Sequence, residues 1–332
     1  MENPLSLFGR YFTKVRPWWV TLIVSLSLLL LPFVAAYIDG SFYLFLSDGN
    51  WRVYILAPII IVYIWLVSPL MARASSQVIE AISSLTTLDS SEFDRITQEA
   101  SKVNPVHEWI AFAIGILLGV LAVLAAGINQ RVSWLIIIWV LSTCLMYGIL
   151  AWTIFVSVTT TRVNTAIHKI PLRIDILNPK QFEAVGRQSL LLALVFIGGI
   201  TLSVLFTYQD ASLSSPEFWI SNIVFILFTM LIFFLSMRPT HRLLSKEKER
   251  ELMPLQSQIN NKCRLLVKQQ DQGMNSSILS GEINALVVYE QRLNNARTWP
   301  YNVTMLRTLF FSVLLPIGSI LARLAVDLIL PK

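Results

Sequence analysis

The sequence predicts an all-α polytopic membrane protein with about seven transmembrane helices and a cytosolic helical hairpin between the sixth and the seventh. Two observations support this fold class. The chain is 55% hydrophobic and only 14% charged, whereas soluble domains carry about 25% charged residues. In addition, six long apolar runs contain no Asp, Glu, Lys or Arg, and a seventh run has a few charges near its ends.

The length of the apolar runs predicts helices that cross the bilayer. A helix rises about 1.5 Å per residue and the hydrocarbon layer is about 30 Å thick, so roughly 20 apolar residues span it. Backbone polar groups in lipid must pair within their own segment, which favours helices. The runs cover about 18–37, 53–71, 109–127, 132–158, 188–208, 218–237 and 303–328.

The runs divide the chain into three parts. Residues 1–239 form a six-helix transmembrane region with cytosolic loops at 72–108 and 159–187. Residues 240–299 form a cytosolic amphipathic helical hairpin, and residues 300–332 hold the seventh transmembrane helix.

The distribution of positive charge predicts the orientation. Of the 26 lysines and arginines, 21 lie in the amino-terminal tail and in alternate loops, and three lie on the opposite side. Loops rich in Lys and Arg stay in the cytosol. We therefore expect a cytosolic amino terminus, a first helix retained as an anchor, and a carboxyl terminus outside. A plasma membrane, of the bacterial inner-membrane type, fits the short outer loops.

Two regions between the runs show regular patterns. Apolar residues alternate with other residues over 170–176, which predicts a short extended segment that needs a partner strand or a packed surface. Two apolar series at three- and four-residue spacing predict the hairpin, interrupted by Lys262 and Glu290. They are Leu252, Leu255, Ile259 and Leu266 in the first arm and Leu279, Ile283, Leu286 and Leu293 in the second. Each arm is shorter than the three clean heptads that define a coiled coil.

Small residues and prolines within the runs predict packing and bending. Ala111, Gly115 and Gly119 lie four residues apart, a spacing that lets membrane helices approach closely. Pro58 and Pro316 lie nearest the midpoints of their runs and are candidate hinges.

Four polar or charged residues in the runs are candidates for function in the membrane. Asn222 lies in the sixth run, and Arg307, Arg323 and Asp327 lie near the ends of the seventh. Long arginine side chains can reach the interface. Two alternatives remain: an anion-selective charge at a pore mouth, or a segment that dips into the membrane, which would give six spans and a carboxyl terminus inside.

The sequence lacks recognisable catalytic motifs. It holds no Walker loop, dinucleotide fingerprint or HExxH. The three histidines lie in different loops, and Cys144 and Cys263 lie in regions that cannot meet. We expect no enzyme activity, no cofactor, no metal and no nucleic-acid partner; the expected partner is the lipid bilayer.

Three functions remain. The first is a membrane sensor or signal transducer that acts through its cytosolic helices, with a protein partner docking on residues 240–299. The second is an oligomeric ion channel gated from the cytosolic side, whose pore would be lined by carbonyls, hydroxyls or apolar constrictions. The third is a small-molecule permease. The absence of ionisable residues from the first six runs disfavours a proton-coupled carrier. A homo-oligomer fits the first two functions.

Overall fold

The computed structural model describes residues 17–47, 51–101, 104–126, 133–167, 170, 172–207, 216–272 and 277–329, and most of them are helical. The elements are α2 (Trp18–Ile38), α3 (Phe42–Ser47), α4 (Trp51–Ser83), α5 (Ser90–Ser101), α6 (Pro105–Ala125), α7 (Trp134–Ile167), the 3₁₀ turn η1 (Pro179–Phe182), α8 (Glu183–Thr207), α10 (Pro216–Asp271), α11 (Ser277–Asn295) and α12 (Val303–Ile329).

Six of the described helices are long and apolar enough to cross a membrane: α2, α4, α6, α7, α8 and α10. This is the helical, polytopic architecture that the apolar runs predict. The apolar part of α12 over Val303–Pro316 is shorter, so the seventh span stays a prediction.

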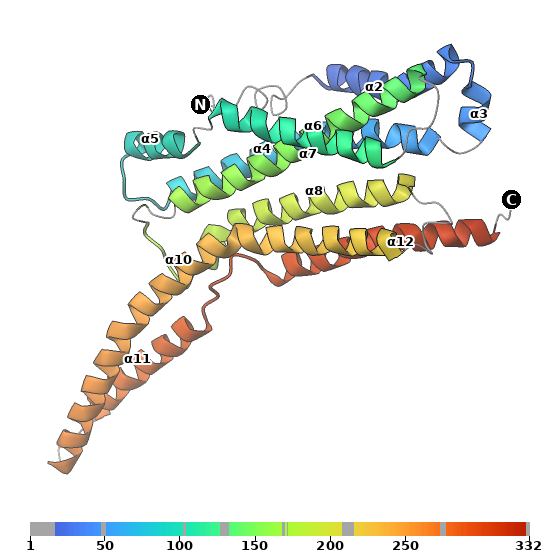
Figure 1. Ribbon diagram of the computed structural model, residues 1–332. Helices are drawn as coiled ribbons and strands as arrows, with labels where there is room; N and C mark the ends of the chain where they lie inside the picture. The colour runs from blue at the N-terminus through green and yellow to red at the C-terminus, as the bar shows by residue number, and fades with distance from the viewer. Residues whose placement is uncertain are drawn as a thin grey trace.

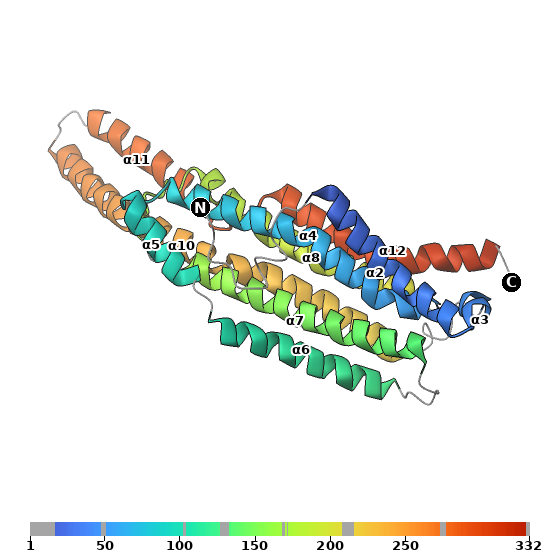
Figure 2. The ribbon, with the colours of Figure 1, turned by 90° about the horizontal axis from the view of Figure 1, so that it is seen from above.

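The helices pack in a chain of neighbours. The helix α6 lies on α7, α7 lies on α2 and α4, α4 lies on α8, and α8 lies on α10 and α12. Figure 1 shows the result as two layers, with α2, α4, α6 and α7 above and α8, α10 and α12 below. Seen from above, α6 forms one edge of the bundle beside α7 (Figure 2). The two layers therefore meet mainly where α4 packs on α8, with a smaller contact between α7 and α10.

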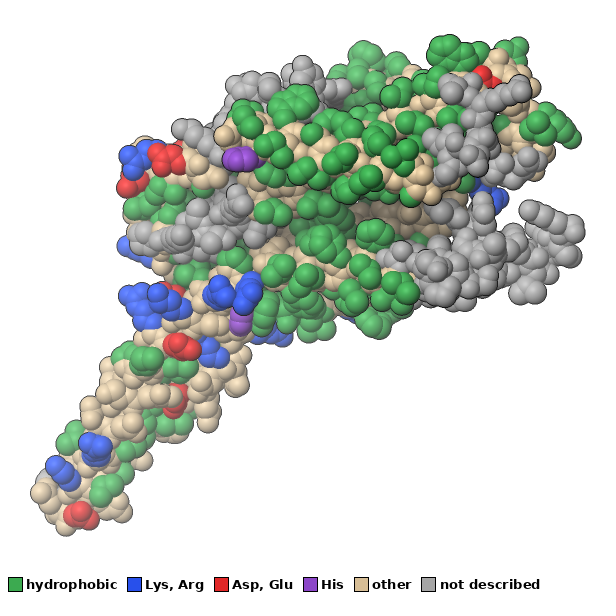
Figure 3. All heavy atoms as spheres, in the orientation of Figure 1, with side chains coloured by type: hydrophobic (Ala, Val, Ile, Leu, Met, Phe, Trp, Pro, Cys, Tyr) green, Lys and Arg blue, Asp and Glu red, His purple; other side chains and the backbone are tan. Residues whose placement is uncertain are grey.

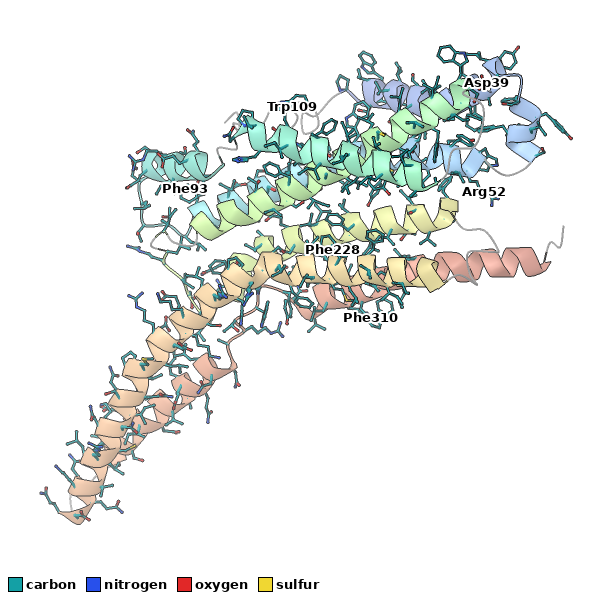
Figure 4. All side chains as sticks on the ribbon, viewed as in Figure 1. Asp39, Arg52, Phe93, Trp109, Phe228 and Phe310 are labelled. Atoms are coloured by element: carbon teal, nitrogen blue, oxygen red, sulfur yellow. The ribbon has the colours of Figure 1, made fainter. Side chains whose placement is uncertain are left out.

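Polar side chains fix the ends of two membrane helices. Asn104 caps α6, because its Oδ1 accepts from the Val106 N–H at 3.1 Å. The carboxylate of Asp39, which follows α2, accepts from the Trp134 and Leu135 N–H groups at 3.1 and 2.9 Å. Asp39 therefore caps α7 from another element, at the end of the bundle far from α5 (Figure 4). The free N–H groups at a helix start and the helix dipole favour such an anion.

The helix α10 runs through the boundary between the expected six-helix region and the expected hairpin. It is one helix from Pro216 to Asp271, and both Pro239 and Pro254 lie inside it. Figure 1 shows α10 leaving the bundle and α11 returning alongside it. We call residues 240–271 of α10 together with α11 the arm.

Candidate functional site: the junction between bundle and arm

The seam between the two helices of the arm uses the predicted apolar residues. Leu255 and Leu293 are buried, and Leu252, Ile259 and Leu286 pack around them. The polar interruptions pair across the seam: Lys262 forms an ion pair with Glu282, and Gln256 Nε2 donates to Glu290 Oε1 at 2.9 Å. The arm is thus an apolar seam with polar pairs at its margins.

Residue 170 and residues 172–178, which we call the strap, follow the predicted alternation where the structure describes them. Ile170 and Ile176 are buried, while Arg173 and Asp175 are exposed. The Arg173 N–H donates to the Leu85 carbonyl at 2.8 Å, and Leu172 forms an antiparallel bridge with Thr86. The strap therefore has the partner and the packed surface that an isolated extended segment requires.

The strap joins the arm to the first half of the bundle. Ile170 lies in a buried cluster with Ile82 of α4 and Phe93 of α5. Six residues later, Ile176 lies in the buried cluster of the arm with Leu255 and Leu293. Leu293 is fully buried, so the two ends of the strap lie in separate buried clusters, one with α4 and α5 and one with the arm.

Residues 296–302, which we call the link, connect α11 to α12 and are held on α10. Lys248 Nζ donates to the carbonyls of Asn294 and Ala296 at 2.6 and 3.3 Å, which satisfies carbonyls at the end of α11 with a cation. The His241 ring stacks on Trp299 at 4.0 Å with an angle of 8° between the rings. The direction of the arm is therefore fixed at two points on α10.

The link also passes closely against α8. A Cβ on Gly186 would lie 2.2 Å from the Pro300 carbonyl oxygen, a distance no side chain tolerates. Asn302 then caps α12, because its Oδ1 accepts from the Met305 N–H at 2.8 Å. Glycine at 186 is thus required for the close approach.

A groove of about 710 Å³ lies between the strap and α10. Part of its charged lining is bonded within the arm: Arg250 pairs with Glu247 at 3.3 Å, and Tyr289 Oη donates to Glu251 at 3.4 Å. The pKa of Tyr289 is raised, first by desolvation and then by the negative charges of Glu251 and Asp175. The groove is therefore a polar surface of the junction, with Arg250, Glu247, Glu251 and Tyr289 bonded to one another in pairs.

The candidate packing residues of α6 lie against α7. Gly115 and Gly119 are buried. A Cβ on Gly115 would lie 2.4 Å from the Tyr147 carbonyl oxygen, and one on Gly119 would lie 2.8 Å from Cys144 Cα. Ala111, one turn earlier, is half-buried. Backbone meets backbone along this pair of helices.

The remaining candidates are dispersed. Pro58 is buried inside α4 and Pro316 inside α12, far along the chain from each other. Arg307 is exposed on α12, with its guanidinium 5.5 Å from the Phe311 ring centre. Asn222, Arg323 and Asp327 belong to α10 and α12, but their side chains lie outside the described residues. Among the candidates whose side chains are described, Pro58, Pro316 and Arg307, no common site is formed.

Sequence reasoning missed a buried carboxylate. Glu108, in the first turn of α6, is only 1% exposed and accepts from Trp152 Nε1 of α7 at 2.6 Å. The available signal was its place directly before a charge-free run, where a charged residue must either face water or find a partner. No group of three metal-ligating side chains occurs among the described residues, and His168 lies outside them.

Comparison of the chain with known protein families, with curated proteins and with solved structures found no match. The junction is therefore the feature from which a function can be argued, since it connects the membrane bundle with the arm.

Proposed function

We propose that this protein is a membrane sensor or signal transducer that passes a change in its helical bundle to the arm through the junction. The observation that carries the proposal is the continuity of α10, a single helix of 56 residues shared by the bundle and the arm. At helical rise it extends about 84 Å. A tilt of its membrane part therefore displaces the far end of the arm.

A second connection supports the same proposal. The strap packs on α4 and α5 at one end and on the arm at the other. The membrane part of α10 is fixed to α8 by packing and by the hydrogen bond from Ser236 Oγ to Ser189 Oγ at 2.7 Å. The arm is thus attached to both layers of the bundle, and a shift between the layers would turn it.

The sidedness belongs to the proposal as well. The excess of Lys and Arg in alternate loops supports a cytosolic position for the arm. The helix α12 has 27 residues, about 40 Å of helix, which is long enough for a seventh span. The carboxyl terminus then lies outside the plasma membrane, and the arm is the surface offered to a cytosolic partner.

Distance measurements between spin labels test the proposal. We would label Arg95→Cys on α5 and Lys268→Cys near the far end of the arm, in a Cys144→Ala, Cys263→Ser background reconstituted in vesicles. We expect two distance populations whose ratio changes with pH, ionic strength or osmotic tension. Ile176→Ser should uncouple that ratio from the stimulus, whereas Met253→Ser, at an exposed position of the arm, should not.

A single unchanged distance distribution under every stimulus would contradict the transducer. Ion flux through the same vesicles would instead favour the oligomeric channel. Flux and arm movement therefore separate the two functions in one preparation.

A further inference from the structure

Four arginines belong to the segments that meet at the link: Arg238 and Arg242 lie on either side of His241, which stacks on Trp299, Arg297 lies in the link, and Arg307 lies in the second turn of α12. All four are exposed. Within the part of the chain that the structure describes, none of them forms an ion pair. Glu183, the acid that contacts the link through Asn302, already pairs with Arg187 at 3.1 Å. The region is a cluster of uncompensated positive charge.

The position of Arg238 follows from its neighbours on α10. Phe234 and His241 both contact Trp299, with ring centres 6.3 and 4.0 Å away. Arg238 follows Phe234 by four residues and precedes His241 by three, so it lies on the same face of the helix. Arg238 therefore projects beside the Trp299 ring.

Arg307 and Arg238 both lie next to one buried cluster. Met237 and Leu309 belong to one buried cluster, and each is within two residues of one of these arginines. The neighbouring side chains on the outer surface are apolar: Leu235 is 45% exposed, and Phe310 and Phe311 are 61% and 55% exposed. In Figure 4, Phe310 points away from the bundle below α12. Figure 3 shows blue Lys and Arg side chains gathered at the root of the arm beside the green apolar face.

We propose that Arg238 and Arg307 hold the headgroup phosphate of an anionic phospholipid beside Trp299. A guanidinium binds phosphate oxygens through two parallel hydrogen bonds. Tryptophan rings favour the headgroup level of a bilayer, and basic residues between helices at this level bind anionic headgroups. The exposed phenylalanines lie where the acyl chains would run, which favours a lipid over a soluble phosphate.

The site would also bear on the arm. His241 and Trp299 fix the link on α10, so a headgroup bound beside them stabilises the arm in the direction the structure shows. The inference requires α10 and α12 to cross the membrane, but it does not depend on the transducer function. A protein that binds the lipid and shows no arm movement would retain this site and lose the proposed function.

Titration with lipids followed by native mass spectrometry tests the site on the full chain. The probes are phosphatidylglycerol, phosphatidylcholine and inorganic phosphate, and the readout is the dissociation constant of the first bound lipid. We expect tighter binding of phosphatidylglycerol than of phosphatidylcholine. The pair Arg238→Gln, Arg307→Gln should weaken phosphatidylglycerol about 25-fold, since one basic residue contributes about fivefold at a membrane surface.

Two further variants keep the result interpretable. Arg264→Gln removes one exposed positive charge from the arm, away from the link, and should leave binding unchanged. Arg238→Lys, Arg307→Lys keeps the charge and should retain part of the affinity, which shows that the glutamine pair fails for chemical reasons rather than through misfolding. Equal binding of both lipids, an equal loss in Arg264→Gln, or full displacement by inorganic phosphate would each overturn the proposal.

Discussion

Two antiparallel helix pairs in this molecule, α6 with α7 and α10 with α11, are held together by opposite means. The first pair meets through Gly115, Gly119 and Gly148, where an added Cβ would strike atoms of the facing helix. The second meets through an apolar seam around Leu255 and Leu293, flanked by an ion pair and a hydrogen bond. The outer face of α6 is apolar, and Trp109 points outward from it (Figure 4).

The difference fits the surroundings that composition predicts for the two pairs, lipid for α6 with α7 and water for the arm. In lipid the hydrophobic effect does not drive helices together, so close backbone contact and dispersion stabilise α6 with α7. In water, burial of leucine side chains drives association of α11 with α10, and charged groups can stay at the rim. The chain therefore builds one kind of antiparallel helix pair in two ways, by close backbone packing at glycines and by burial of leucines. Substitutions can test the two separately.

The largest effect is expected from Gly115→Leu. The new side chain would begin 2.4 Å from the Tyr147 carbonyl oxygen and 2.7 Å from Gly148 Cα, and neither backbone atom can yield. Overpacking of this kind should lower the free energy of unfolding by more than about 3 kcal/mol. Thermal unfolding in detergent measures the loss. Gly199→Leu is the matched control, because nothing lies within 4 Å of a Cβ at that glycine. Equal losses in both variants would refute the packing rule.

Leu293→Ala should be the next in size. The side chain is fully buried at the root of the arm, and its truncation should cost about 2–3 kcal/mol. Hydrogen exchange should show faster opening of α11, with α6 and α7 unaffected. Val288→Ala, at a position of α11 that is 44% exposed, is the control. It should change the free energy of opening that hydrogen exchange reports by less than about 0.5 kcal/mol. A global change in exchange would show that the arm is not an independent unit.

Trp152→Phe tests the polar contact inside the glycine-packed pair. It leaves the buried Glu108 without its indole donor, at an expected cost of about 1–2 kcal/mol. Trp134→Phe, at an exposed tryptophan of the same helix, is the control. Unfolding curves of the two variants that coincide would show that the hydrogen bond contributes nothing.

Lys262→Gln probes the rim of the arm. Its ion pair with Glu282 is partly exposed, so the loss should stay below about 1 kcal/mol and should shrink as salt screens the wild-type pair. Denaturation at low and high salt measures it. A loss that grows with salt would point to packing by the Lys262 stem rather than to charge.

The smallest effect concerns the groove. The raised pKa of Tyr289 means that the folded protein holds this proton more tightly than the unfolded chain, whose tyrosine titrates near 10.0. The associated stability is present below that pH and is lost as the pH rises through the raised pKa. Tyr289→Phe should flatten the alkaline end of the stability curve, and Glu251→Gln should flatten it in part. If stability against pH is the same for Tyr289→Phe as for the wild type, Tyr289 does not contribute to the pH dependence.

The sequence by itself determined the helical class, the six long apolar helices and the residues of the arm seam. Those features depend on the length of each apolar run and on apolar residues repeating every two to four positions. Both can be read within a single segment of the sequence. Leu252, Leu286 and Ile176 lie on the inner faces that their spacing predicts, because each pattern is repeated within one element.

Only the tertiary structure decided how the elements meet. Pro239 and Pro254 argue locally for breaks, yet α10 continues through both, since Met237, Leu244 and Leu255 on either side of them are buried. The burial of Glu108 beside Trp152 and the closeness of Gly186 to Pro300 likewise join residues far apart in the chain. Such contacts depend on the complementary shapes of separate helices, and no local pattern encodes which surfaces will meet.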